Sequence, residues 1–153
     1  MEEMEEARLN YAEIVEKYFT DNDWNFTAKK IDDDIFFSLP LGAKNLPGLD
    51  VKLIVDTDGD CKIRCYLAKG VADKKRDEML EVLNSLNTKY RYVTLSLDTD
   101  NDVLASYDFR IFGDAETADR QVGAMIFIVS RIMDKCVPKI MRVIWNDDED
   151  EED

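Results

Sequence analysis

The run Asp56–Asp60 (Asp-Thr-Asp-Gly-Asp) carries the side chains best suited to bind a metal ion. Carboxylates at alternate positions beside a glycine are typical of calcium loops, in which oxygen atoms bind the ion. The EF-hand loop needs glycine at its sixth position and glutamate at its twelfth. Counted from Asp56, the glycine is fourth and the twelfth residue is Leu67. We therefore expect a turn, which Asp and Gly favour, and no metal site.

The chain has three cysteines and no histidine. Cys61 and Cys65 would share one face of a strand, but zinc sites use closely spaced cysteine pairs, usually together with histidine. Unpaired cysteine is among the most buried residue types, so we expect these side chains in the core. An odd number of cysteines, with Cys136 as the third, fits a reducing cytoplasm better than a disulfide framework. We therefore expect a cytoplasmic protein.

No catalytic centre stands out in the sequence. The absence of histidine removes the commonest general base, and no nucleophile is marked by a neighbouring base. The glycine-rich motifs that hold nucleotide phosphates are absent as well. We expect a protein that is not an enzyme, with no catalytic residues and no cofactor.

The net charge of −14 is concentrated at the two ends of the chain. Residues 147–153 are all acidic, and four of the first six residues are glutamate, whereas every Lys and Arg lies between Arg8 and Arg142. The body is therefore nearly neutral, which argues against nucleic acid and anionic membranes as partners. The N-terminus lacks the apolar segment of a signal peptide. We expect one domain over residues 1–146, with residues 1–6 frayed and 147–153 forming a disordered acidic tail.

The periodicity of apolar residues predicts the elements that hold these groups. Met79–Tyr90 has a helical apolar stripe, and Val93–Leu97 and Val103–Ile111 alternate as two strands around an acidic turn. The segment Val51–Asp60 repeats the pattern of Val93–Asp102, which predicts a second, similar hairpin. Asp73 is suited to cap the start of the helix that contains Met79–Tyr90.

Further elements flank this central unit. A helix is predicted over Leu9–Phe19, then two strands and a loop over Pro40–Asp50. A long helix follows Gly113, which Pro138 should kink or break near Asp134. The order predicts an α+β fold with a single, mainly antiparallel sheet of about six strands and helices at the N-terminus, in the middle and at the C-terminus.

A family resemblance agrees with this order of elements. The helix ending Leu83-Asn84-Ser85-Leu86-Asn87, the hairpin over Val93–Phe112 and the closing helix with Pro138 and Ile144 resemble the YbjN-like family of sensory transduction regulators. That family is similar in fold to class I type III secretion chaperones. The resemblance implies an α+β fold, frequent homodimerisation and a protein-binding role, and it implies no catalytic residues.

We therefore expect a non-catalytic cytoplasmic protein-binding module, chaperone-like or an adaptor, that binds another polypeptide by an apolar surface or by strand addition at a sheet edge. The alternative is a regulatory sensor domain in a stress or signalling pathway. Three helices supply more apolar surface than one apolar sheet face can bury. We therefore also expect a homodimer, or an apolar face that another chain covers. The candidate protein-binding or dimer surface consists of Phe127, Ile128, Tyr107 and Phe109.

Overall fold

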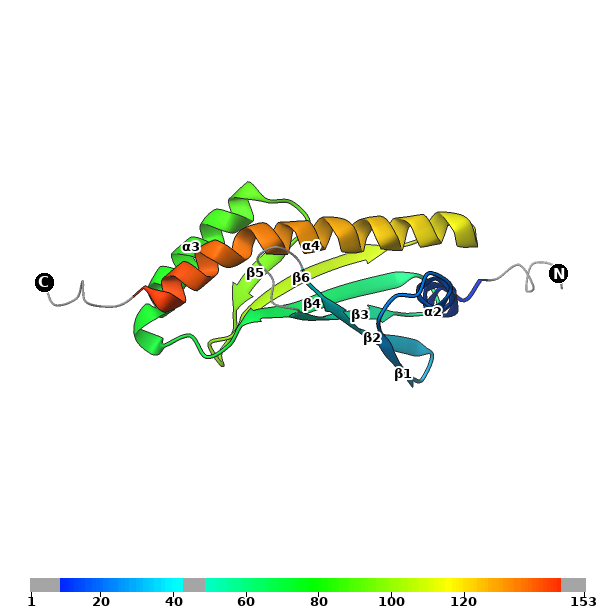
Figure 1. The fold of residues 1–153 in the computed structure, drawn as a ribbon, viewed down its shortest axis with the longest axis horizontal. Coiled ribbons are helices and arrows are strands. Elements are labelled where there is room, and N and C mark those ends of the chain that lie inside the picture. The colour runs from blue at the N-terminus through cyan, green and yellow to red at the C-terminus, as the bar shows by residue number, and fades with distance from the viewer. Residues whose placement is uncertain (1–8, 43–48, 147–153) are drawn as a thin grey trace, which may run out of the picture.

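A computed structural model describes residues 9–42 and 49–146, and in it three helices lie on one side of a six-stranded sheet (Figure 1). This confirms the predicted α+β class and the single antiparallel sheet. The predictions for residues 1–6 and 147–153 lie outside the described residues. None of the helices within the described part is both long and apolar enough to cross a membrane.

Strand order in the sheet is β1-β2-β3-β4-β6-β5, and every neighbouring pair is antiparallel. The elements in chain order are α2 (Tyr11–Asp21), β1 (Thr27–Ile31), β2 (Asp34–Leu41), β3 (Leu49–Val55), β4 (Asp60–Ala68), the short 3-10 helix η1 (Asp73–Lys75), α3 (Arg76–Lys89), β5 (Thr94–Leu97), β6 (Val103–Arg110) and α4 (Ala115–Trp145). The helices therefore come before, inside and after the run of strands.

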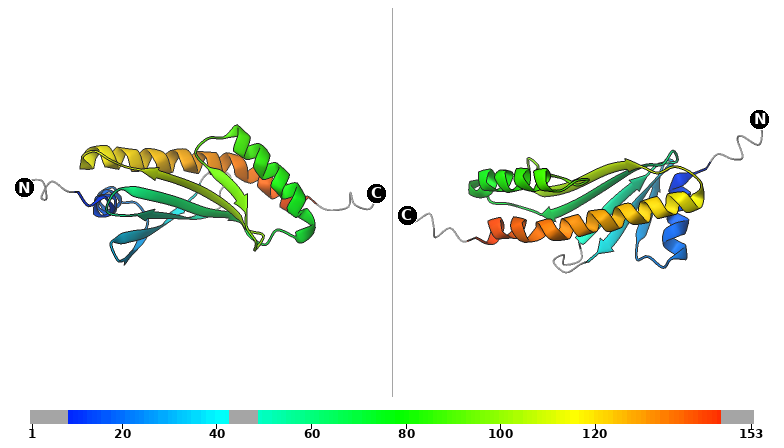
Figure 2. Two further views of the ribbon diagram at one scale, coloured as in Figure 1. Left: turned by 180° about the vertical axis from the view of Figure 1, so that it is seen from behind. Right: turned by 90° about the horizontal axis from the view of Figure 1, so that it is seen from above.

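Alternation of side chains along the strands creates one apolar face, which the helices cover. Its central part is formed by fully buried residues of three strands: Ile35, Phe37 and Leu39 of β2, Val51, Leu53 and Val55 of β3, and Cys61, Ile63 and Cys65 of β4. The long helix α4 crosses this face and buries a continuous stripe from Ala118 to Val143 (Figure 2). The cysteines are buried in this core, as predicted.

The two acidic turns have the same hydrogen bonds, which confirms the predicted pair of similar hairpins. In each turn, the Oδ1 atom of the first aspartate accepts from the N–H groups two and four residues later, at 2.9 and 2.9 Å for Asp56 and at 2.9 and 3.0 Å for Asp98. The fourth residue has positive φ in both, 100° at Gly59 and 64° at Asn101. Glycine and asparagine tolerate this backbone conformation best.

Pro138 was predicted to kink or break the last helix, and the predicted break is wrong, because α4 is one helix from Ala115 to Trp145. Figure 1 shows it curving toward its C-terminal end. A proline inside a helix costs about 3 kcal/mol. Ile140 and Val143 beyond it are buried, and each such side chain contributes about 1.5–3 kcal/mol when it is removed from water. Packing of the last turns therefore outweighs the lost hydrogen bond.

Two further local predictions need correction. The loop predicted over Pro40–Asp50 is shorter, because Pro40 pairs with Asp50 and Leu41 with Leu49 in the sheet. Proline is tolerated there because β1 reaches only to Ser38 on the other side of β2. Asp73 does not cap α3. It lies in η1, and its carboxylate accepts a hydrogen bond from the Asn101 side chain at 2.6 Å.

Candidate functional site

Strand β6 extends beyond its neighbour β5, and this difference in length creates an open sheet edge. β5 pairs with β6 only from Val103 to Ser106, whereas β4 pairs with β6 as far as Arg110. The second half of β6, Tyr107–Arg110, thus has no strand on its β5 side among the described residues. Figure 2 (right) shows β6 running along the rim of the sheet toward the start of α4.

The main-chain groups of Asp108 and Arg110 point to this vacant side. The N–H group of Ile111 donates to the carbonyl oxygen of Gly59, next to β4, at 2.9 Å. Successive residues of a strand turn their main-chain groups in opposite directions. Residues with odd numbers therefore bond toward β4. Asp108 and Arg110 present their N–H and C=O groups where the next strand would lie.

A tight turn at Tyr92, just before β5 begins at Thr94, forms one border of the open edge. The N–H group of Val93 donates to the Arg91 carbonyl oxygen at 2.8 Å, and Tyr92 has φ of 76°. This is the geometry of a γ-turn of the rare, strained kind. It directs the chain away from β6 and sets the Tyr92 ring edge-on against Tyr107, with ring centres 5.5 Å apart.

A side-chain amide closes the other border. Gln121 on α4 accepts from the Phe112 N–H group at 3.0 Å and donates to the Phe112 carbonyl oxygen at 3.1 Å. Its amide thereby satisfies both main-chain groups of Phe112, as a residue of a neighbouring strand would. The open edge is consequently limited to the stretch between Ser106 and Phe112.

Two adjoining hollows lie along this edge, with volumes of ≈ 550 and ≈ 450 Å³, and they share Tyr107. We call them together the β6 bay. Its lining residues are Arg91, Tyr92, Thr94, Ser106, Tyr107, Asp108, Phe109, Arg110, Phe112, Thr117, Arg120, Gln121, Ala124 and Met125. The rings of Tyr107 and Phe109 stack with centres 5.4 Å apart, so the inner wall is an aromatic row opposite α4.

Charge in the bay is mostly positive. Arg91, Arg110 and Arg120 line it, together with one carboxylate, Asp108. Asp108 pairs with Arg64 at 2.6 Å, and Arg120 pairs with Glu116 at 2.8 Å. Burial, with a smaller contribution from Tyr92, raises the pKa of Tyr107. That hydroxyl therefore stays protonated at neutral pH and can donate a hydrogen bond.

The sequence matches the family YbjN, described as “Putative bacterial sensory transduction regulator”, over residues 11–142. The chain belongs to the YbjN family. Its fold is similar to the crystal structure of YbjN from E. coli, described as a “putative transcription regulator”, with 16% identity over 80% of this chain and 88% of that one, at a TM-score of 0.54. It is also similar to the Yersinia pestis type III secretion chaperone SycH, solved in complex with a fragment of YscM2, with 12% identity over 84% of this chain and 98% of that one, at a TM-score of 0.50. No curated protein matches the sequence.

The helix ending that resembles the YbjN family has a structural role at a second edge. Asn87 accepts from the Leu95 N–H group at 2.8 Å and donates to the Leu95 carbonyl oxygen at 3.0 Å, on the outer side of β5. This is the arrangement that Gln121 makes with Phe112. In this YbjN-family chain, two helix amides thus stand in for missing strands.

Of the four predicted surface residues, Tyr107 and Phe109 line the β6 bay. Ile128 is half-buried one helical turn beyond Met125, on the adjoining part of α4. Phe127 is 60% exposed and carries the Arg131 guanidinium over its ring, 5.5 Å from the ring centre. The structure therefore groups two of the four residues and places Phe127 on a separate, more exposed surface.

The sequence prediction missed Tyr92, Gln121 and the open edge. A positive φ at tyrosine and a bond between an α4 side chain and Phe112 depend on tertiary structure. One signal was nevertheless present. The apolar alternation covers five residues in Val93–Leu97 but nine in Val103–Ile111, and unequal strands leave part of the longer one without a partner.

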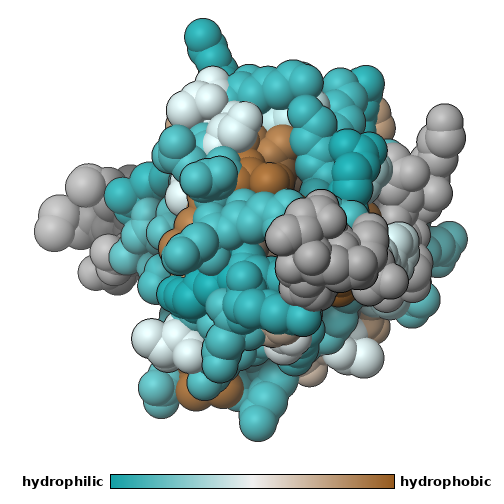
Figure 3. Space-filling model, turned by 90° about the vertical axis from the view of Figure 1, so that its left-hand side faces the viewer, coloured by the Kyte–Doolittle hydropathy of each residue, from teal (hydrophilic) through white to brown (hydrophobic). Residues whose placement is uncertain are grey.

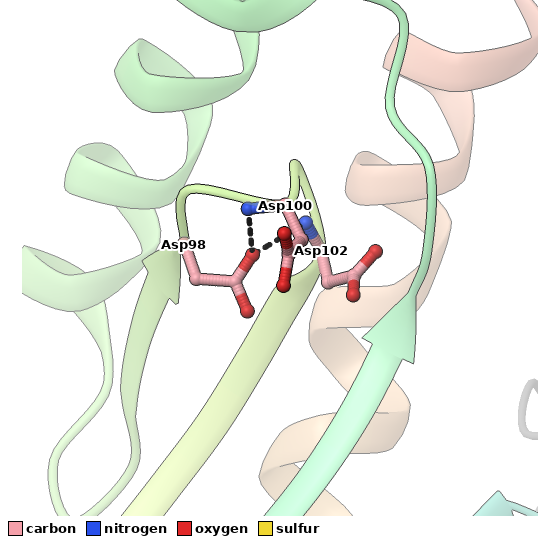
Figure 4. Close-up of side chains that lie close together, drawn as sticks. All are labelled: Asp98, Asp100 and Asp102. Atoms are coloured by element: carbon pink, nitrogen blue, oxygen red, sulfur yellow. Dashed lines mark hydrogen bonds between the residues drawn. The ribbon is translucent and has the colours of Figure 1, made fainter.

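The second acidic turn brings three carboxylates together (Figure 4). One oxygen atom from each of Asp98, Asp100 and Asp102 lies within 4.8 Å of the others. These groups already serve the turn, since Asp98 accepts from both other residues and Asp102 accepts from the Gly70 N–H group at 2.8 Å. The cluster is explained by the hairpin that it closes.

The C-terminal half of α4 packs against α3 and leaves a smaller hollow of ≈ 350 Å³ between them. Apolar side chains of Val82, Leu86 and Val143 line it together with polar ones. The end of the molecule that faces left in Figure 1 is largely hydrophilic, with small hydrophobic areas between the polar side chains (Figure 3). Compared with the β6 bay, this hollow has no open main-chain edge.

Proposed function

We propose that this YbjN-family chain is a non-catalytic protein-binding module, chaperone-like or an adaptor, that holds an extended segment of another polypeptide in the β6 bay. The observation that carries the proposal is the open edge at Asp108 and Arg110, closed at both ends and backed by aromatic rings. Strand addition at such an edge is a recurring mode of peptide recognition.

The bound segment would continue the line of β5. Its main chain would pair with the N–H and C=O groups of Asp108 and Arg110, and alternate side chains would pack on Tyr107 and Phe109. At about 3.3 Å per residue, the gap between Ser106 and Phe112 admits about five residues. SycH, which is similar in fold, was solved with a fragment of another protein bound. This supports a polypeptide as the ligand.

The cysteine environments support a non-catalytic, cytoplasmic protein. Burial raises the pKa of Cys61 and Cys65 to about 12 and that of Cys136 to about 11, so the reactive thiolate is scarce at neutral pH. Unpaired thiols are typical of reducing compartments. The family description and the two similar structures name regulators and a chaperone.

The family description also favours the second candidate, a regulatory sensor domain. In that case the β6 bay would bind a segment of a signalling partner and report its presence. A sensor for a small molecule would instead need a more enclosed pocket with convergent polar groups. Binding of a peptide without a change elsewhere in the protein would favour the adaptor or chaperone function.

We also propose that the chain forms a homodimer. Phe112 and Phe127 are 64% and 60% exposed, and aromatic side chains are enriched at interfaces between protein chains. Light scattering coupled to size exclusion should give twice the chain mass at tens of micromolar. A monomer mass that does not change with concentration would contradict the dimer and leave the peptide-binding proposal intact.

Two substitutions of one residue test strand addition. Arg110→Pro removes an N–H group that faces the vacant side and so costs no hydrogen bond of the sheet. Arg110→Ala, the matched control, keeps that N–H group and loses only the side chain. Random decapeptides displayed on phage should be enriched by the wild type and by Arg110→Ala, and not by Arg110→Pro. Equal enrichment on all three, or none on the wild type, would contradict the proposal, provided that the variants melt like the wild type.

A further inference from the structure

We infer that the strand taken up in the β6 bay has a sequence pattern, read from its N-terminus: apolar, acidic, apolar, polar, apolar. The acidic side chain lies opposite Arg110. This inference rests on the proposed function and adds the chemistry of the ligand. It follows from which side chains of β6 point to each face of the sheet.

The inner face of the bay requires apolar side chains at alternate positions. Tyr107 and Phe109 point to the helix side of the sheet, as does the fully buried Ile111. Residues directly opposite each other on neighbouring strands share a face. The three positions opposite these residues therefore point toward α4, where Ala124 and Met125 form the wall. Apolar side chains at these positions would pack on the two rings and on Met125 and would lose no hydrogen bond to water.

On the outer face, the charges of Asp108 and Arg110 distinguish the two remaining positions of the bound strand. Asp108 and Arg110 are exposed on the side that the helices leave open. Asp108 already pairs with Arg64 at 2.6 Å, whereas Arg110 makes two longer contacts, with the Asp60 carboxylate at 3.6 Å and with the Asp58 carbonyl oxygen at 3.4 Å. A guanidinium carries five N–H donors, so Arg110 can serve a second carboxylate. An acid opposite Arg110 is favoured, and an acid opposite Asp108 is repelled.

The direction of the strand follows from the sheet. All five strand pairs are antiparallel, and the vacant position continues the line of β5, which is itself antiparallel to β6. A segment in this direction begins near Gln121 and ends near Arg91. The residue opposite Arg110 is then the second of the five. The residue opposite Asp108 is the fourth.

Three pentapeptides with acetylated and amidated ends test the pattern: Val-Glu-Val-Thr-Val, Val-Lys-Val-Thr-Val and Val-Thr-Val-Glu-Val. The third has the composition of the first, with the acid moved opposite Asp108. Each is titrated into the full chain while the amide signals of Asp108 and Arg110 are followed by NMR. Replacing a like-charge pair by an opposite-charge pair should tighten binding by roughly 2- to 30-fold, so the first peptide should exceed the second by this factor. It should also bind more tightly than the third.

Substitution of Arg110 identifies the group that reads the acid. With Arg110→Gln the preference for glutamate over lysine should fall toward onefold, and with Arg110→Glu it should reverse. Equal affinities of the wild type for the three peptides, or a preference that survives Arg110→Glu, would overturn the inference alone. Absence of any shift at Asp108 and Arg110 with all three peptides would instead overturn the proposed function on which it rests.

Discussion

Replacement of Lys75 by methionine should destabilise the protein more than the same replacement of an exposed lysine on one of its helices. The Lys75 side chain is only 8% exposed, and its Nζ atom donates to the carbonyl oxygens of Val143, Ile144 and Asn146 at 3.0, 2.9 and 2.5 Å. Two of these carbonyls belong to the last turn of α4 and the third to Asn146, which follows it, so none has a helical N–H partner. Lys75 therefore closes the C-terminal end of the long helix from a distant part of the chain.

The size of the effect follows from two contributions. A cation at a helix C-terminus in a partly buried place contributes up to about 2 kcal/mol. A buried acceptor that loses its donor costs about 1–3 kcal/mol, and Val143 is the buried one of the three residues. Water can reach the Asn146 carbonyl in the variant, which offsets part of the loss. We expect about 3 kcal/mol, or a fall in Tm of roughly 6–12 °C for a chain of this size.

Thermal melting and urea unfolding of Lys75→Met measure this loss, and Lys135→Met is the matched control. Lys135 is exposed on α4 itself, so its replacement should change stability by less than about 0.5 kcal/mol. Hydrogen exchange should also become faster in the last turn of α4 in Lys75→Met. A variant that melts within about 2 °C of the wild type, with unchanged exchange there, would refute the argument that Lys75 closes the helix.

Four further predictions concern other parts of the molecule. The thiol of Cys61, with a pKa of about 12 against an ordinary 9.0, should react with Ellman's reagent about a thousandfold more slowly at pH 8 than after unfolding; a fast native reaction would show that it is accessible. Asn87→Ala should cost about 1.5–3 kcal/mol because both its strand contacts are lost, while exposed Asn84→Ala on the same helix should change little. Melting curves in EDTA and in millimolar calcium should coincide, because Asp98 already bonds the turn; a shift of several degrees would point to an ion. The pKa of Asp114 is lowered from 3.8, mainly by the hydrogen bond from the Thr117 N–H group. Its ionised form therefore stabilises the fold above about pH 4, and this contribution is lost as pH falls through the lowered pKa. Asp114→Asn should be less stable than the wild type at pH 7, and the difference should shrink as the pH is lowered below about 4.

The strands and helices were predictable because each has its own apolar period. Alternation at Val93, Leu95 and Leu97 gave the face of β5, and the acidic residues gave both turns. These are local properties of the chain, so they can be derived without tertiary contacts. Pro138 shows the opposite case. Its local effect is to interrupt a helix, but burial of Ile140 and Val143 against the rest of the protein outweighs it.

Only half of the candidate site could be predicted, for a related reason. Tyr107 and Phe109 are apolar residues on one strand face, which the pattern identifies. The borders of the β6 bay are set by Tyr92, whose backbone adopts a strained turn, and by Gln121, whose amide reaches a residue nine positions earlier in the chain. Glutamine on a helix and tyrosine before a strand are ordinary residues, and nothing in their types announces these contacts.

The paired amides of Asn87 and Gln121 have a consequence for how the protein behaves at high concentration. An uncovered sheet edge can recruit further chains one after another, which leads to aggregates and fibres. Asn87 caps Leu95 on the edge of β5, and Lys29 and Lys30 place charge on the opposite edge of the sheet. Growth in either direction is thereby blocked after at most one short strand. The protein can therefore offer the open main-chain edge at Asp108 and Arg110 to one ligand strand without adding further copies of itself strand by strand.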